Sequence, residues 1–301
     1  MTPIRLVVAC FGLLAAAAAA RAAEISVAPV LRIETGMHGA AINGIAADEA
    51  DHQLVTVSDD KTARVWSATD GTLLTTIRAP VGPGAEGGLY AATLSPSGKT
   101  IVVGGYTGID WDGSASIYLY SRVDGAWLGR IALGPGTDAV NRLAFSPNGR
   151  FIAVATNDRR GLRIIDTGGQ KLSIVDSDYG DAIEWVDFAA DGRLVASALD
   201  GEVRLYDAAF KKLATWHAPK GEKPYAAVFD RSGGSVAVGL LGGGGVVVLD
   251  GHSLKQKAAF RGAAGKPGAL SVVAWSADGG TLYAAGTYGD PSGRKRVRAW
   301  P

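Results

Sequence analysis

Residues 143–149 read Leu-Ala-Phe-Ser-Pro-Asn-Gly, a short hydrophobic segment that runs into a turn ending on glycine. A second hydrophobic segment follows, so the pair predicts a β-hairpin in which glycine takes the positive φ of the turn. Four further copies of this form end their turns at Gly98, Gly192, Gly233 and Gly279. A weaker sixth copy at residues 42–57 lacks the turn glycine. The five glycines are spaced 41 to 51 residues apart, which indicates an internal repeat.

Two more short hydrophobic segments complete each repeat. The third strands are expected at residues 63–66, 117–120, 162–165, 203–206, 246–249 and 297–300. The fourth strands are expected at residues 73–78, 127–133, 171–175, 212–217 and 257–261, and one of the same type lies at residues 30–34. Four strands that recur every 40–50 residues are typical of propeller blades. The sequence therefore predicts an all-β propeller of six four-stranded blades, with a seventh blade left open, and an N-terminal strand at 30–34 closing the last blade.

Residues 58–66 read Ser-Asp-Asp-Lys-Thr-Ala-Arg-Val-Trp, residues 36–38 read Gly-Met-His, and residues 199–207 read Leu-Asp-Gly-Glu-Val-Arg-Leu-Tyr-Asp. The first two together, and the third as a second match, resemble the WD40 repeat (WD40/YVTN-like) family, and the chain is similar to its bacterial exported type. The resemblance implies a structural network in which Asp60 pairs with His38 and Trp66, with Thr56 or Ser58 between them. It assigns the equivalent positions of the second match to Asp200 and Tyr206. The match is degenerate in the other repeats.

The N-terminus has the features of a secretory signal peptide. Arg5 precedes an apolar run at residues 6–20, and Ala20-Arg21-Ala22 is a small-x-small cleavage pattern. We expect a signal peptide at 1–23, a propeller domain at 24–301, and export to the periplasm or the medium without a transmembrane anchor. Cys10, the single cysteine, would be lost with the signal. The alternatives are an uncleaved anchor or a lipoprotein site at Cys10.

Charge and motifs argue against several classes of function. The formal net charge is +1 with no basic run, which gives no support for binding to nucleic acid or anionic membranes. The four histidines lack metal-ligand spacing, and no nucleophile elbow, metalloprotease motif or phosphate loop is present. Asp110-x-Asp112 resembles the start of a calcium-binding loop, but the residues that follow do not supply the remaining ligands of such a loop. We therefore expect no enzyme activity, no cofactor and no metal site.

The candidate partner-binding surface consists of loop insertions at one end of the predicted blades. Residues 104–114 and 286–295 are insertions at the same point of their repeats, and residues 80–88 lie at the same end. Trp, Tyr and Arg dominate interface hot spots, so exposed aromatic and charged side chains here favour partner binding. The alternative is that the aromatic rings of these loops only pack against the propeller and keep the insertions ordered. The candidate residues are Tyr106, Asp110, Trp111, Asp112, Tyr288, Asp290 and Arg294.

We therefore predict an exported, monomeric, non-catalytic scaffold that binds a protein partner. One alternative is a six-bladed propeller hydrolase or lactonase, for which Asn43, Asn141, Glu184 and Asp187 are the notable inner-strand side chains. Another is a sensor part related to bacterial WD40 regions that are joined to caspase-like peptidases.

Overall fold

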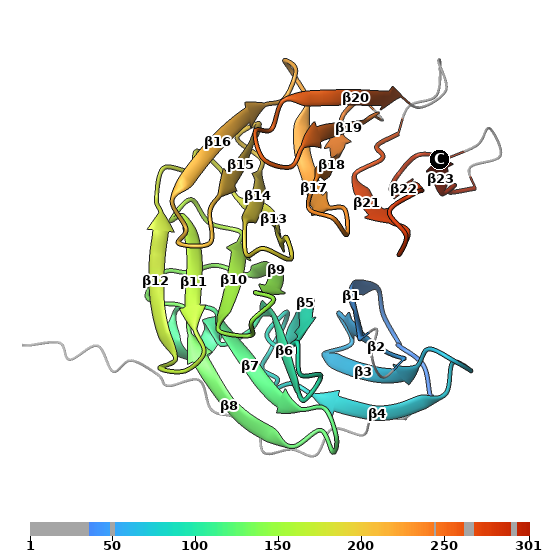
Figure 1. The fold of residues 1–301 in the computed structure, drawn as a ribbon. Helices are drawn as coiled ribbons and strands as arrows, with labels where there is room; N and C mark the ends of the chain where they lie inside the picture. The colour runs from blue at the N-terminus through green and yellow to red at the C-terminus, as the bar shows by residue number, and fades with distance from the viewer. Residues whose placement is uncertain (1–35, 49–51, 244, 262–267, 290–293) are drawn as a thin grey trace, which may run out of the picture. The chain divides into compact units, whose positions relative to one another are not determined.

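The computed structural model describes residues 36–48, 52–243, 245–261, 268–289 and 294–301. Within them, 23 strands form six antiparallel sheets, and consecutive strands are neighbours in every sheet. The inner strands β1, β5, β9, β13, β17 and β21 surround a common centre (Figure 1). The chain from residue 34 onward is a six-bladed propeller, as the repeat predicts.

The strand bounds follow the predicted segments to within a few residues. The first three blades are β1 Ile42–Asp48, β2 Gln53–Ser58, β3 Thr62–Ser67, β4 Leu73–Arg78; β5 Gly88–Leu94, β6 Thr100–Tyr106, β7 Ser116–Ser121, β8 Trp127–Ala132; and β9 Val140–Phe145, β10 Phe151–Thr156, β11 Leu162–Asp166, β12 Lys171–Asp176. The last three are β13 Ile183–Phe188, β14 Leu194–Ala198, β15 Glu202–Tyr206, β16 Lys212–His217; β17 Lys223–Phe229, β18 Ser235–Leu241, β19 Gly245–Asp250, β20 Gln256–Arg261; and β21 Val272–Trp275, β22 Leu282–Ala285, β23 Arg298–Trp300.

Five blades have four strands, and blade six has three within the described residues. The strand expected at residues 30–34, which would supply its fourth, lies outside them, as does the predicted signal peptide. A seventh sheet is absent from the described part of the chain.

The core consists of five hydrophobic clusters, each formed between two consecutive blades. Both faces of a blade are hydrophobic because β-branched residues alternate along the middle strands. Val55 and Val57 on β2 face blade two, for example, and Val102 on β6 faces blade three. The blade therefore offers a mainly apolar face to each neighbour.

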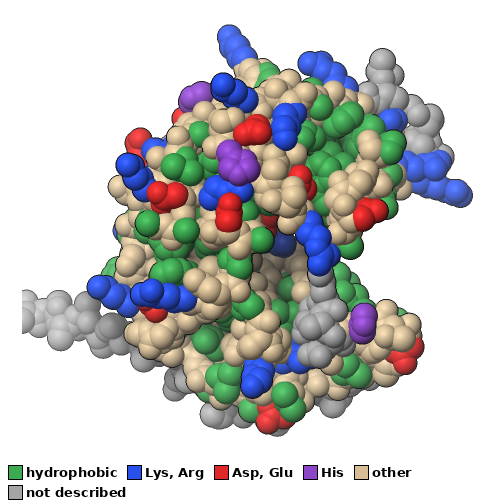
Figure 2. Space-filling view, in the orientation of Figure 1, with side chains coloured by type: hydrophobic (Ala, Val, Ile, Leu, Met, Phe, Trp, Pro, Cys, Tyr) green, Lys and Arg blue, Asp and Glu red, His purple; other side chains and the backbone are tan. Residues whose placement is uncertain are grey.

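Strand direction alternates, so two kinds of connection meet at one end of the propeller. These are the connections from second to third strands and those from each fourth strand to the next blade. We call this end the top face and the other the bottom face. On the side of the molecule seen in Figure 2, the surface is hollowed near its centre, and basic and acidic side chains are interspersed.

Candidate functional site

A buried carboxylate organises the top face of blade two. Glu86, in the loop between β4 and β5, has no exposed surface. Its Oε1 accepts the backbone N–H of Gly108 at 2.5 Å, and its Oε2 accepts the backbone N–H of Asp110 at 3.0 Å. These donors open a single helical turn, α1 Ile109–Asp112, which stands in the predicted insertion between β6 and β7. One side chain thus joins residues 80–88 to residues 104–114, and we call these two loops the top-face platform.

Blade one also contacts the top-face platform, through residues 80–88. The ammonium of Lys61 donates to the carbonyl oxygens of Gly82 at 3.2 Å and of Gly84 at 2.8 Å. On α1, Trp111 is 41 % exposed, and Asp112 forms an ion pair with Arg130 at 2.5 Å. The platform therefore presents an exposed indole on a loop whose backbone is fixed by side chains from two neighbouring elements.

The other predicted surface residues lie in different settings. Asp110 is exposed, and Tyr106 is half-buried at the end of β6. Tyr288 is only 4 % exposed, because Arg298 lies over its ring at 5.0 Å and donates to its hydroxyl at 2.7 Å. Tyr288 therefore offers no ring surface to a partner in this conformation. Arg294 is exposed, and Asp290 lies outside the described residues.

His38 and Asp60 are joined in a chain of hydrogen bonds at the top of blade one. The Nδ1 atom of His38 lies 2.9 Å from Oδ2 of Asp60, and its Nε2 atom lies 2.7 Å from Oγ1 of Thr56. The indole N–H of Trp66 donates to the same Thr56 oxygen at 2.7 Å. A neutral His38 protonated on Nδ1 satisfies every contact, since it donates to the carboxylate and accepts from the threonine hydroxyl. Thr56 is thus the bridging residue, and Ser58 instead accepts the backbone N–H of Asp60 at 3.0 Å.

The carboxylate of Asp60 is stabilised as an anion. Partial burial acts to raise the pKa of Asp60, but hydrogen bonds from Thr62, from the backbone N–H of Gly39 and from His38 outweigh it. The pKa is consequently lowered to about 2. Asp60 therefore stays ionised throughout the range in which the protein would be handled.

Blade four builds the equivalent network from different side chains. Asp200 accepts the backbone N–H of Gly180 at 3.1 Å, as Asp60 accepts that of Gly39. Tyr179 takes the place of histidine, and its hydroxyl lies 2.7 Å from that of Tyr206. Tyr206 donates in turn to Asp176 at 2.8 Å, so Tyr179 must donate to Tyr206. This hydroxyl chain does not include Asp200. Arg204 connects the two predicted residues instead, since it pairs with Asp200 at 3.5 Å and with Asp176, the acceptor of Tyr206, at 3.1 Å.

The inner strands of four blades contain a bulge at a polar residue. Pairing with the second strand skips one residue in blades one to four, namely Asn43, Tyr90, Asn141 and Glu184. Asn43 and Asn141 each donate to a backbone carbonyl of the next blade, at 3.1 and 3.0 Å. Bulges commonly redirect side chains next to functional sites. Two of the four residues, however, are used to tie neighbouring blades together.

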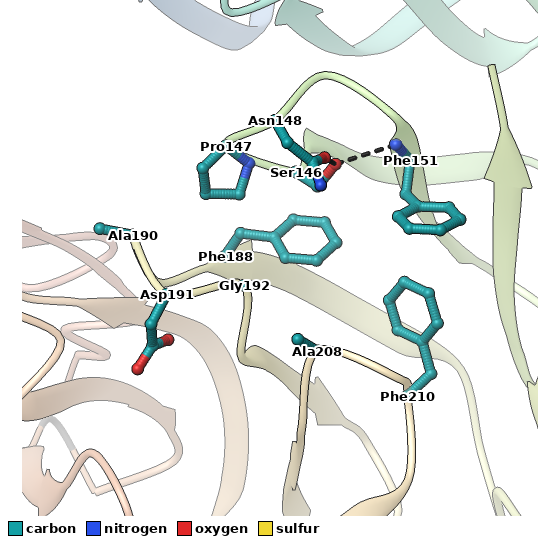
Figure 3. A pocket seen from close by; sticks show the side chains of 10 residues that line it. All are labelled: Ser146, Pro147, Asn148, Phe151, Phe188, Ala190, Asp191, Gly192, Ala208 and Phe210. Atoms are coloured by element: carbon teal, nitrogen blue, oxygen red, sulfur yellow. Dashed lines mark hydrogen bonds between the residues drawn. The ribbon is translucent and has the colours of Figure 1, made fainter. Parts of the chain in front are cut away.

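The bottom face carries a pocket of about 140 Å³ between blades three and four. Figure 3 shows the rings of Phe151, Phe188 and Phe210 converging on it, with Asp191 at its rim. Phe210 packs edge-on against Phe151 at 5.0 Å and holds a φ of +64°, which is costly for a side chain of this size. The equivalent turns of blades one and two use Gly71 and Gly125. Phe210 thus closes the blade interface from below at the expense of a strained turn.

The described residues contain no group of three or more His, Cys, Asp or Glu side chains that could hold a metal ion. Among those same residues, no helix combines the length and hydropathy needed to span a bilayer.

Comparison with known proteins identifies the repeat in three places. The family model described as WD domain, G-beta repeat matches residues 32–67, 131–160 and 171–207. No curated protein matches the chain. Each matched segment contains the same backbone contact, in which the N–H of Gly39, Asp138 or Gly180 donates to the carboxylate of Asp60, Asp158 or Asp200. Three segments of the chain, in three of its blades, are therefore similar to the WD40 repeat.

Proposed function

We propose that this propeller is a non-catalytic scaffold that binds a protein partner through its top-face platform. The observation that carries the proposal is the exposed Trp111 on a loop fixed by the buried carboxylate of Glu86. Ordering flexible loops on binding costs free energy, so a loop that is already ordered keeps more of the contact energy. WD40 propellers commonly bind proteins, and the three WD40 segments support the same conclusion.

The chemistry of the platform favours a partner with apolar and basic groups side by side. Trp111 offers a large apolar surface, and Asp110 next to it is exposed. Asp112 is already paired with Arg130, so Asp110 is the carboxylate more available to a partner's lysine or arginine. An aromatic centre with a charged rim is the usual composition of an interaction hot spot.

Affinity capture with matched variants tests the proposal. The protein is immobilised as wild type, as Trp111→Ala and as Leu128→Ala, and is exposed to the proteins of its own cell envelope. Leu128 is the control, because it is 54 % exposed on the outer strand β8, away from the platform. We expect one partner to be retained by wild type and Leu128→Ala and lost with Trp111→Ala. Equal capture by all three proteins would contradict the assignment.

We also propose that the protein is exported and that residues 30–34 form the fourth strand of blade six. The match at residues 171–207 begins with the fourth strand β12, and the match at residues 32–67 begins at the position two residues further along the corresponding segment before β1. Blade six has an open edge at β23 within the described residues. Pairing there would join the two ends of the propeller and remove an exposed edge. The mass of the mature protein purified from the periplasm or the medium tests the expected cleavage near Ala22 or Ala23.

A further inference from the structure

The guanidinium of Arg142 lies flat over the indole of Trp185 near the propeller centre. Arg142 follows the bulged Asn141 at the top end of β9, and Trp185 follows the bulged Glu184 on β13. The guanidinium carbon is 3.7 Å from the centre of the indole ring. The ring of Tyr225 lies 6.4 Å from that of Trp185, measured between ring centres. The three side chains come from blades three, four and five.

The hydrogen-bond donors of Arg142 have no acceptor among the described residues. Its Nε atom is buried without a partner, and its terminal nitrogens make no hydrogen bond or ion pair within the same residues. A buried donor left unsatisfied costs roughly 1–3 kcal/mol, and more when it is charged. Arg163 also has a buried Nε atom without a partner, but its terminal nitrogens donate to Asp158 at 3.2 Å and to Thr156 at 2.7 Å. Arg142 makes neither kind of contact within the described residues, so its guanidinium is open to an acceptor from outside the chain.

Three titratable side chains on the inner strands of blades four and five lie around Arg142 and Tyr225, namely Glu184, Asp187 and Tyr225 itself. Burial lowers the pKa of Arg142, and the nearby carboxylate of Asp187 partly offsets the effect. Asp187 acts on Arg142 through its charge and not through a hydrogen bond. Its carboxylate accepts the backbone N–H of Phe229 instead, at 2.8 Å. Burial and Asp181 raise the pKa of Glu184, which is itself close enough to influence Tyr225. The hydroxyl of Tyr225 makes no hydrogen bond within the described residues.

We propose that Arg142, held flat by Trp185, is the recognition group of a carboxylate-binding site at the top end of the central channel. Stacking fixes the plane of the guanidinium and leaves its edge to bond both oxygens of a planar carboxylate. Tyr225, whose ring neighbours that of Trp185, offers its hydroxyl as a further donor. A phosphate monoester would bring about two negative charges toward Glu184 and Asp187, so a monoanionic carboxylate fits better. The carboxylate is carried by a small free acid or by an acidic side chain of a protein segment.

This site is separate from the top-face platform and does not depend on it. Trp111 and Glu86 belong to blade two and its entry loop, whereas Arg142, Trp185 and Tyr225 lie on inner strands of blades three to five. Loss of partner capture in Trp111→Ala would leave carboxylate binding unchanged, so each proposal can fail while the other stands.

Nuclear magnetic resonance of the full mature protein tests the site directly. Sodium acetate is titrated at constant ionic strength, with acetamide as the neutral isostere, while the Arg142 Nε–H and Trp185 indole signals are followed. We expect saturable shifts with acetate and none with acetamide. A blocked glutamate tripeptide and succinate are then compared with acetate, since tighter binding of the first indicates a protein segment and of the second a small acid.

Four variants decide whether Arg142 is responsible. Arg142→Gln should weaken acetate binding on the order of tenfold or more, and Arg142→Lys, which keeps the charge but not the fork, should fall between. Asp187→Asn should tighten binding several-fold by removing a nearby negative charge. Arg150→Gln, an exposed bottom-face arginine paired with Asp166, should have no effect. No saturable shift in wild type, or a shift that survives in Arg142→Gln, would overturn the proposal.

Discussion

The buried carboxylate of Glu86 lies 2.5 Å from the backbone nitrogen of Gly108, although the two residues are 22 positions apart in the chain. This contact converts two glycine-rich loops into one ordered surface. Gly108 has a φ of +83°, which lets the turn into α1 point its N–H group at the carboxylate. The platform on which Trp111 stands is thus a product of tertiary structure and not of local helix propensity.

Replacing Glu86 by alanine should loosen the platform. The N–H groups of Gly108 and Asp110 would lose their acceptor, at a cost of roughly 1–3 kcal/mol for each group that stays buried. Chemical denaturation should show this loss, and partner capture should fall as in Trp111→Ala. Glu222→Ala is the control, because Glu222 accepts one loop N–H, that of Gly243, at an exposed contact of 2.8 Å. Equal destabilisation by the two variants would contradict the role of Glu86.

The Asp60 network should make stability depend on acidic pH. The folded-state pKa of about 2 lies below the ordinary value of 3.8, so the carboxylate contributes stability above about pH 4. That contribution should be lost as the pH falls from about 4 to about 2, and it is of the order of 1 kcal/mol after allowing for solvent. Urea denaturation of wild type and Asp60→Asn across this range measures the difference. Parallel pH profiles for the two proteins would show that the network contributes nothing.

Tyr206 should be more important for stability than the tyrosine at the same place in blade two. The Tyr206 hydroxyl joins Tyr179 to Asp176, so Tyr206→Phe leaves two polar groups short of a partner and should cost roughly 1–3 kcal/mol. The hydroxyl of Tyr120 makes one long contact of 3.4 Å to the carbonyl of Arg78. Tyr120→Phe should therefore cost less than about 1 kcal/mol. Thermal unfolding of both variants measures the two losses of stability. A larger loss in Tyr120→Phe than in Tyr206→Phe would contradict the role of the Tyr206 hydroxyl.

The proposed closure of blade six makes a register prediction. Tyr179 and the bulged Glu184 of blade four correspond to His38 and the bulged Asn43, so Arg32 corresponds to Ser173. Ser173 pairs with Ile164, whose counterpart in blade six is Ala299. Arg32→Cys with Ala299→Cys should therefore form a disulfide in the mature protein.

The same experiment has an internal control. Arg32→Cys with Arg150→Cys places the second thiol on blade three and should give no intramolecular bond under equal oxidation. Mass spectrometry after proteolysis distinguishes the products. A failure of the Arg32–Ala299 pair to cross-link, with both variants folded, would contradict closure by residues 30–34.

The blades could be predicted from sequence because their signals are local. The hairpin at residues 143–149 became β9, the turn at Gly149 and β10, and the other glycine turns behaved alike. The platform could not be predicted in this way. The partners of Glu86 are more than twenty residues away, and nothing in the sequence around Pro80 marks its carboxylate as buried.

Tyr288 is the opposite case, a residue that the sequence places on the surface and the structure places in the interior. It was expected on the surface because it lies in a glycine-rich insertion, yet Arg298 on β23 covers its ring. Arg142 is a further case, since its lack of an acceptor depends on which side chains of blades four and five surround it. Tertiary contacts decide all three residues, within blade two for Glu86, within blade six for Tyr288 and between blades three and four for Arg142. The local hydrophobic pattern of the strands does not contain that information.

Hydrogen–deuterium exchange of the propeller with its captured partner tests the central claim most directly. The account predicts that binding protects backbone amides at residues 80–88 and 104–114, and that the bottom-face turns at 146–151 and 188–192 exchange as in the free protein. Protection confined to the bottom face, with unchanged exchange across the top-face platform, would contradict it.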